Sequence, residues 1–395
     1  MVPNIKFDSG SHKSDQHGSF SEIVCRTLLS SNSPVLDSFS LVDISESEVS
    51  KDLESWIGIA FARHVRKLVL KLRIDYQVQD LITFPSVFCG CNNTLEILEL
   101  KYKYLFVLDF PCRVGLKSLK KLDLRYVGFE GGEECVCNLL GGCPSLEDLV
   151  VYRKGNYDAK TFTIAVPSLR RLTIKDSFQG TRNGGYVIKA PCLKYLKIKG
   201  VGSIDTRFGS FSFIGGHCSL GGQGIDESEW YGFCLIENAP QLVEAKIIGV
   251  IDIHVHNENI MESLTSAQRL SLDFSPLKVC DEISYHFFRH IGMTKQKKIS
   301  TAGECEWEQH PKRVPECLLS HLETLVWTRY AWDREDDKQV ATYILENARR
   351  LKKATFYTEP IQPNIKSEER EMLLNELANV ARASNSCHLM FESSD

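Results

Sequence analysis

Two histidines and a set of cysteines are the side chains of this sequence most able to bind a metal. His254 and His256 lie two apart in a segment predicted as a strand, so both imidazoles could face one way as ligands. A third ligand at a recognisable spacing is missing, which leaves ordinary strand or surface histidines as the simpler explanation. Closely spaced cysteines that lack the Cys-x-x-Cys pattern of zinc and redox sites, and that we interpret as buried thiols, are Cys89, Cys91, Cys135, Cys137 and Cys143. We predict no metal site.

The sequence also contains no clear phosphate-binding or catalytic motif. Gly200 and Gly202 are not followed by the third glycine of a dinucleotide-binding fingerprint, and no Gly-Lys-Ser/Thr phosphate loop occurs. The acidic run from Asp333 to Asp337 precedes a predicted helix. Its negative charges would interact favourably with the positive end of the helix dipole, so a structural role is simpler than a metal site. We therefore predict no cofactor and no catalytic residue, and we expect the protein not to be an enzyme.

A set of outward-facing side chains is the remaining candidate site, because it occupies the alternate positions of successive predicted strands. Its charge is basic, with eight Lys or Arg against two carboxylates, so it could hold an acidic or phosphorylated segment of a protein partner by charge-assisted hydrogen bonds. The alternative is that a half-exposed sheet needs soluble polar residues on its open side. The candidate partner-binding residues of this concave strand face are Lys67, Lys71, Glu99, Lys101, Asp123, Arg125, Tyr152, Lys175, Lys197, Lys199 and Lys246.

A repeated six-residue phrase must position these side chains. It reads Leu-Lys-Lys-Leu-Asp-Leu from Leu119 and returns at Leu146, Leu169 and Leu193, at intervals of 27, 23 and 24 residues. That period is typical of leucine-rich repeats. The fourth and sixth residues lie two apart on a short strand and face the core, so the residues between them face out.

Weaker copies of the phrase extend the pattern over most of the chain. The intervals from Leu193 to Leu242 and from Ala267 to Leu322 are about twice the usual period, and each could hold a degenerate or replaced repeat. The predicted copies start at Val65, Leu95, Leu119, Leu146, Leu169, Leu193, Leu242, Ala267, Leu322 and Leu351. The predicted fold class is α/β, a leucine-rich-repeat solenoid with parallel strands on its concave face.

The last part of the chain has longer elements that would cap the open end of the solenoid. A helix is predicted from about Asp336 to Arg350, and Ser367 can begin another whose apolar residues, including Met372 and Leu377, face inward. We predict a flexible tail over residues 1–18, the solenoid over 19–306 and the C-terminal α/β cap over 307–395.

Composition agrees with a folded protein and excludes some partners. The net charge is −4, which gives no general attraction to nucleic acid, and 43% of residues are hydrophobic. The first residues carry no apolar core of a signal peptide, and no run approaches the length of a membrane helix. We expect a cytoplasmic or nuclear protein with reduced cysteines and no membrane partner.

Three motifs in the second half of the sequence give the chain a resemblance to a known family. The segment from Trp307 to Thr324, the run from Tyr343 to Thr355 and the sequence Arg382-Ala-Ser-Asn-Ser-Cys resemble the FBD domain of plant F-box proteins. Two further segments, from Ala190 and from Leu264, are similar to the repeats of the same family. The resemblance covers roughly Phe20 to Phe391.

The resemblance implies a protein-interaction function. Members of this family usually begin with an F-box, which docks on the adaptor of a cullin-based (SCF-type) ubiquitin ligase, while the repeats hold the substrate. No segment of this sequence resembles an F-box. We therefore expect a non-enzymatic module that resembles the substrate-recognition part of such a ligase, with an unknown protein substrate. The alternative is a free-standing repeat protein without a ligase role.

Overall fold

In the computed structural model, each predicted repeat phrase leads into a β-strand that starts two residues after the first residue of the phrase. Leu119, for example, precedes a strand that starts at Lys121, and Leu322 precedes one that starts at Thr324. The pattern predicts these starts because only one phase of the strand buries both of its leucines.

The structure describes residues 3–8, 20–30, 33–45, 52–73, 82–83, 88, 91–109, 114–129, 131–154, 161–177, 185–200, 212–214, 217–220, 223–224, 233–248, 264–273, 314–330, 335–358 and 367–393. His254, His256 and Gly202 lie outside these residues, as does the start of the acidic run at Asp333. The chain divides into a first unit, residues 1–175, and a second unit, residues 176–395.

The first unit is built on a parallel sheet. Its strands follow the order β1 (Asn4–Asp8), β2 (Ser38–Ser45), β3 (Lys67–Arg73), β6 (Ile97–Asp109), β8 (Lys121–Phe129), β9 (Asp148–Lys154) and β11 (Arg171–Ser177), whose last residues belong to the second unit. Short β4 (Ile82–Thr83) pairs with β6, and β5 (Cys91–Asn92) pairs with β7 (Gly115–Leu116). Helices α1 (Phe20–Ser30), α3 (Leu53–Ala62) and α4 (Gly132–Gly141) and strand β10 (Thr161–Ala165) complete it.

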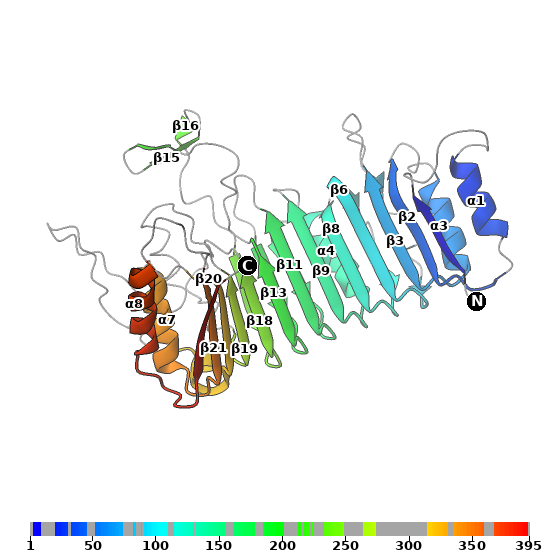
Figure 1. The fold of residues 1–395 in the computed structure, drawn as a ribbon. Coiled ribbons are helices and arrows are strands. Elements are labelled where there is room, and N and C mark those ends of the chain that lie inside the picture. Colours follow the sequence, from blue (N-terminus) through cyan, green and yellow to red (C-terminus); the bar gives the residue numbers. More distant parts are fainter. Residues whose placement is uncertain are drawn as a thin grey trace. The chain divides into compact units, whose positions relative to one another are not determined.

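Helices cover one face of this sheet. Figure 1 shows α3 and α4 on the same side of the strands of the first unit. The inward residues of the strands are fully buried there, as Leu98, Leu122 and Leu149 illustrate, and Trp56 of α3 is fully buried as well. We call the opposite side, which no described helix covers, the open face.

Strand β1 overturns one prediction. Residues 1–18 were expected to form a flexible tail, but Asn4–Asp8 pairs in parallel with β2, and Ile5 and Phe7 are buried. Phe7 also lies edge-on to Phe20 of α1, with ring centroids 5.9 Å apart. A segment of five residues has too few alternating positions for its apolar face to stand out in the sequence.

The second unit continues the repeat pattern. Its parallel strands follow the order β13 (Tyr195–Lys199), β18 (Glu244–Ile248), β19 (Arg269–Asp273), β20 (Thr324–Tyr330), β21 (Lys353–Thr358) and β22 (His388–Ser393). The unit also has β12 (Gly185–Lys189) paired with β17 (Phe233–Asn238), a π-helical turn η4 (Cys317–His321), and helices α7 (Glu335–Asn347) and α8 (Ser367–Ala378).

The two long intervals add no strand to this sheet, contrary to the expected degenerate repeats. Strand β13 pairs directly with β18, and β19 pairs directly with β20. The first interval instead contains β14 (Ser212–Ile214), β15 (His217–Leu220) and β16 (Gln223–Gly224), which pair antiparallel in a separate small sheet. An inserted segment can leave the sheet because strand pairing depends on register and not on chain length.

A ladder of shared carbonyls aligns the strand starts in both units. The carbonyl oxygen of Arg66 accepts hydrogen bonds from the N–H groups of Glu96 and Ile97, at 2.8 and 3.0 Å. In the next repeat, the carbonyl oxygen of Glu96 accepts hydrogen bonds from the N–H groups of Lys120 and Lys121. Glu323 of the second unit repeats the arrangement. These bonds satisfy the turn backbone and hold neighbouring strands in one register.

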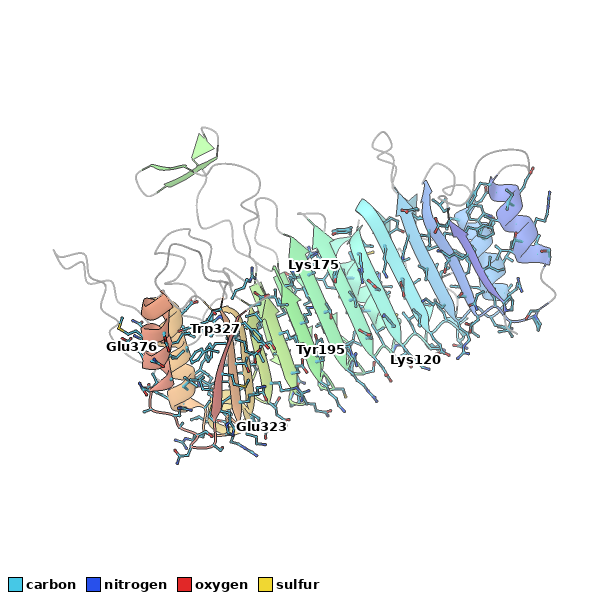
Figure 2. The ribbon with its side chains drawn as sticks, viewed as in Figure 1. Lys120, Lys175, Tyr195, Glu323, Trp327 and Glu376 are labelled. Carbon is cyan, nitrogen blue, oxygen red and sulfur yellow. The ribbon has the colours of Figure 1, made fainter. Side chains whose placement is uncertain are left out.

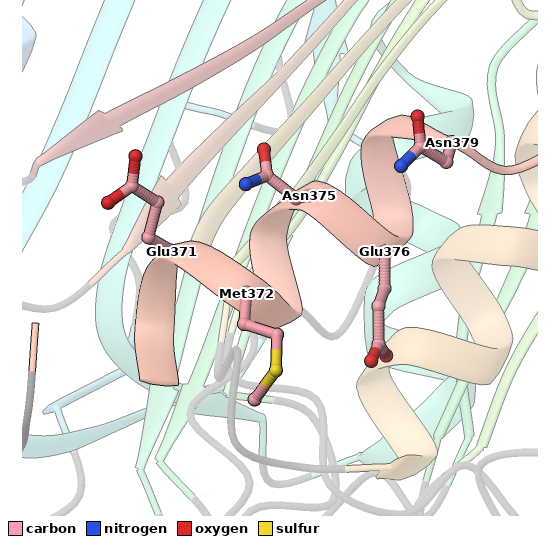
Figure 3. Close-up of a pocket in the computed structure, with 5 residues that line it drawn as sticks. All are labelled: Glu371, Met372, Asn375, Glu376 and Asn379. Atoms are coloured by element: carbon pink, nitrogen blue, oxygen red, sulfur yellow. The ribbon is translucent and has the colours of Figure 1, made fainter. Parts of the chain in front are cut away.

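Helix α8 differs from its prediction at Met372. Leu377 is fully buried as expected, but Met372 is 57% exposed. Met372 instead borders an open pocket along α8, together with Glu371, Asn375, Glu376 and Asn379 (Figure 3). The helix has too little contrast between its faces for the sequence to distinguish them, and Glu376 pairs with Lys338 of α7.

Candidate functional site

Strand pairing places the candidate residues of the first unit in two rows on the open face. In the middle row, Val69 pairs with Glu99, Glu99 with Asp123, and Asp123 with Val150. In the distal row, Lys71 pairs with Lys101, Lys101 with Arg125, and Arg125 with Tyr152. Lys175 occupies the same position on β11 and completes the distal row as Lys71, Lys101, Arg125, Tyr152 and Lys175.

The distal row lies towards the far end of the strands. Figure 2 shows Lys175 near that end, while Lys120, in the turn before β8, lies near the strand starts. Lys67, also predicted as a site residue, belongs to a third row at the strand starts, where it pairs with Ile97. The structure therefore brings together eight of the predicted residues in the first unit.

Both carboxylates of the middle row are held by lysine or arginine. Lys101 Nζ lies 2.6 Å from Glu99 and 3.0 Å from Asp123, and Lys67 Nζ lies 3.6 Å from Glu99. Arg125 donates from Nε and Nη2 to the two oxygens of Asp123, at 2.8 and 3.1 Å. The side chain of Asp123 is only 3% exposed, so these bonds offset the cost of burying its charge.

These contacts shift the ionisation of the network. Burial by itself would raise the pKa of Glu99, but the hydrogen bond from Lys101 and the nearby positive charges outweigh it, so the pKa is lowered. The pKa of Arg125 is raised, chiefly by its hydrogen bond to Asp123. Both groups are therefore held in their charged forms.

Tyr152 organises the other end of the distal row. The guanidinium of Arg125 lies 4.5 Å from the centroid of the Tyr152 ring, and Lys175 Nζ lies 5.3 Å from it. Strand β9 lies between β8 and β11, so the ring receives one cation from each neighbouring strand. Such cation–π contacts hold flexible cationic side chains in place, because the face of the aromatic ring carries partial negative charge.

Among the described residues, the cations at the two ends of the row have no carboxylate partner. Within the part of the chain that the structure describes, neither Lys71 nor Lys175 forms an ion pair. Lys71 is exposed, and Lys175 is half-buried beside Tyr152. The open face therefore carries more positive than negative charge at its distal row, even though its central charges neutralise one another.

The predicted site residues of the second unit form a separate group. Lys197 is half-buried and pairs in register with Lys246, while Lys199 is exposed. Lys246 Nζ lies 3.2 Å from Glu244 and 5.9 Å from the centroid of the Tyr195 ring.

Sequence reasoning missed residues that belong to this second group. Glu244 also forms an ion pair with Arg269 at 3.1 Å, and Asp273 forms an ion pair with Arg329 of the next strand. Taking the first outward position of every strand, which holds Lys67, would have found Glu244 and Arg269. Arg329 has positive φ and lies within a bulge of β20, which the repeat pattern does not signal.

The predicted buried thiols are only partly confirmed, and Cys89 lies outside the described residues. Cys135 and Cys143 are buried as predicted, but Cys137 is exposed because it lies on the outer side of α4. Burial raises the pKa of Cys143 to about 12, so its thiol stays protonated near neutral pH. Among the described residues, no group of three or more metal-binding side chains is placed to hold an ion. No described helix has the length and apolar character to span a membrane.

Comparison with known proteins identifies the repeats and the C-terminal region. The FBD family profile matches residues 309–356. A second profile, described as the LRR repeats of FBD-associated F-box protein At5g56370, matches residues 53–208. These matches and the strand pattern confirm the predicted α/β leucine-rich-repeat fold with a C-terminal FBD region. No solved structure matches the chain.

Relatives from Arabidopsis thaliana match the chain over nearly its whole length. The putative F-box/FBD/LRR-repeat protein At3g49030 is 45% identical over 422 residues, which cover 100% of this chain and 87% of the relative. The F-box/FBD/LRR-repeat protein At2g04230 is 45% identical over 433 residues, covering 100% and 89%. The putative protein At3g49040 of the same description is 46% identical over 406 residues, covering 99% and 88%. The chain therefore belongs to the plant F-box/FBD/LRR-repeat protein family.

Proposed function

We propose that this chain is a non-enzymatic substrate-recognition module of an SCF-type ubiquitin ligase, and that its open strand face holds a protein substrate. The observation that supports the proposal is the open face itself. Charged side chains of β3, β6, β8 and β11, with Tyr152 of β9 between the last two, stand on it in successive strands, and no described helix covers them.

The form of this face suits a protein segment better than a small molecule. Small ligands are usually enclosed in apolar pockets with a few polar groups, whereas repeat proteins present extended surfaces. Here Lys71, Lys101 and Arg125 stand side by side, one on each neighbouring strand. A polypeptide can contact several such positions at once.

The ligase role rests on the family. Relatives that the chain covers to 85–89% of their length carry the term F-box in their names. In proteins of this family, as the resemblance implies, the F-box docks on the ligase adaptor and the repeats hold the substrate. We assign this chain the second part of that division, in the cytoplasm or nucleus.

Co-purification from plant cells tests the proposal. The tagged chain should recover substrates together with the ligase adaptor and the cullin, which it would reach through a contact other than an F-box or through a partner F-box protein. Recovery of other proteins without adaptor and cullin would contradict the ligase role and favour a free-standing binding protein.

Charge-reversal variants separate the two parts of the proposal. Lys175→Glu together with Lys199→Glu should remove substrates without removing adaptor and cullin, because the ligase contact is not expected on the outward face of the strands. Lys117→Glu and Lys194→Glu form the matched control, since both lysines are exposed but precede their strands. Equal substrate loss in the control would show that capture depends on net charge and not on this face.

A further inference from the structure

The distal row has a charge pattern that points to one class of partner. It contains four cations, Lys71, Lys101, Arg125 and Lys175, and no carboxylate. The carboxylates of the neighbouring middle row, Glu99 and Asp123, are already bound by Lys101, Arg125 and Lys67. Among the described residues, the uncompensated charge is therefore concentrated at the ends of the row, on Lys71 and Lys175.

The spacing of these charges distinguishes between possible anions. Neighbouring strands lie about 4.8 Å apart, so the row from Lys71 on β3 to Lys175 on β11 extends over roughly 19 Å. Its two free cations are separated by the whole row and do not converge on one point. A phosphate group, with its charge on one small centre, is best bound by several donors together, often by the fork of an arginine.

The arginine of the row is not available for that role. Arg125 already donates from Nε and Nη2 to both oxygens of Asp123, and its flat face lies against Tyr152. Each free lysine offers a single compact charge to one carboxylate. The geometry therefore favours several dispersed carboxylates over one phosphate.

We propose that the distal row binds an acidic, unphosphorylated segment of a partner protein, which crosses the strands so that its carboxylates reach Lys71 and Lys175. Tyr152, placed between Arg125 and Lys175, holds the cationic end of the row in position. This inference rests on the proposed function, because it names the class of substrate that the open face recognises.

Fluorescence anisotropy with the full chain tests the inference directly. The probe is a fluorescein-labelled peptide of alternating Glu and Ser, roughly eight residues long, which extended covers about 26 Å. It should bind, and its affinity should fall as salt rises, because exposed charges are screened. The first comparison peptide has Gln in place of every Glu. The second has the same Gln substitutions and also a phosphoserine in place of one Ser.

A paired substitution locates the binding site. Lys71→Ala with Lys175→Ala should weaken binding of the acidic peptide on the order of tenfold, since two exposed ion pairs are lost. Lys117→Ala with Lys194→Ala is the matched control and should bind as the original chain does. Because Lys71 and Lys175 have no carboxylate partner in the described structure, their removal leaves no charge unpaired, and an unchanged circular dichroism spectrum would confirm folding.

The outcomes separate this inference from the proposed function. Equal binding of the Gln peptide, tighter binding of the phosphoserine peptide, or no effect of the paired substitution would overturn the inference. If the paired variant still recovered the same substrates from plant cells, the inference would fail while the ligase role stood. If the original chain bound the acidic peptide but recovered no adaptor or cullin, the ligase role would fail and the inference would stand.

Discussion

The strands of the first unit and the strands β20 to β22 of the second use the same alternation of inward and outward positions but fill it differently. In β6, β8 and β9 the two inward residues of each repeat phrase are aliphatic, such as Leu122, and the middle outward row carries Glu99 and Asp123. In β20 to β22 the inward residues include Trp327 and Phe356.

The middle outward row of β20 to β22 is also different, because it is uncharged. Val326 pairs with Thr355, and Thr355 pairs with Met390. The same backbone repeat can therefore carry a charged middle row or an uncharged one. Electrostatic recognition should depend on the first unit more than on β20 to β22, and aromatic packing should matter most for the stability of these three strands.

The largest expected effect tests the aromatic side of this comparison. Trp327 is 1% exposed, and its ring centroid lies 5.4 Å from Tyr330 and 6.1 Å from Phe356. Trp327→Ala should lower the free energy of unfolding by about 3–5 kcal/mol, because it leaves a large cavity. Denaturant unfolding followed by circular dichroism measures the change. Met390→Ala, at a residue 38% exposed, should change it by about 0.5 kcal/mol or less.

A smaller effect tests the buried charge of the first unit. Asp123→Asn should lower the free energy of unfolding by about 1–3 kcal/mol, because Lys101 and Arg125 lose their shared carboxylate. This figure is below that of a fully buried pair, since both cations keep some contact with water.

Asp148→Asn is the matched control for that substitution. Burial raises the pKa of Asp148, and the charges of Lys121 and Arg171 lower it less, so the ionised form is less stable in the fold than in the unfolded chain. Neutralising Asp148 should therefore cost little or stabilise the protein near neutral pH. Equal destabilisation by both substitutions would show that the Asp123 network has no special role.

The charged network of the first unit should also make stability depend on pH, through Glu99. The folded pKa of Glu99 lies below its ordinary value of 4.5, so its ionised form contributes stability that is complete above pH 4.5. That contribution should be lost as pH falls from 4.5 through the folded pKa. The difference in unfolding free energy between the original chain and Glu99→Gln should shrink over this range in a pH series of denaturant titrations. A difference that grew in acid would contradict the direction of the shift.

The smallest effect is expected at the exposed edge beside the strand starts. Glu96 lies 2.8 Å from Arg66 and 3.0 Å from Lys120, and these partners lower the pKa of Glu96. Glu96→Gln should cause only a slight loss of stability, because exposed ion pairs contribute little. The loss should vanish in about 1 M salt, where the screening length is about 3 Å. A loss that persisted would show that Glu96 acts through packing.

Sequence patterns predicted the elements with strong periodicity and failed where the contrast was weak. The ten strand starts follow from the leucine phrases, and α7 follows from its apolar face. Met372 was assigned to the core but is exposed, and Asn4–Asp8 was assigned to a tail but forms β1. In both segments too few apolar positions distinguish one face from the other.

The candidate site was predicted in its residues but not in its contacts. The phrase identified Lys101, Asp123 and Arg125 as outward-facing, and the structure agrees. It did not reveal that Lys101 would reach a carboxylate on the neighbouring strand, 22 residues away in sequence. Such a contact depends on the pairing register and on a side-chain rotamer, neither of which a single repeat encodes.

By itself, the sequence determined the phase of every repeat strand, because only one phase buries leucine at both inward positions and a shift by one residue would expose them. Tertiary structure alone decided which outward charges neutralise one another and which remain available. Coulombic attraction depends on distances of a few ångströms, and only the stacking of strands brings Asp123 to Lys101 while leaving Lys71 and Lys175 without a carboxylate among the described residues.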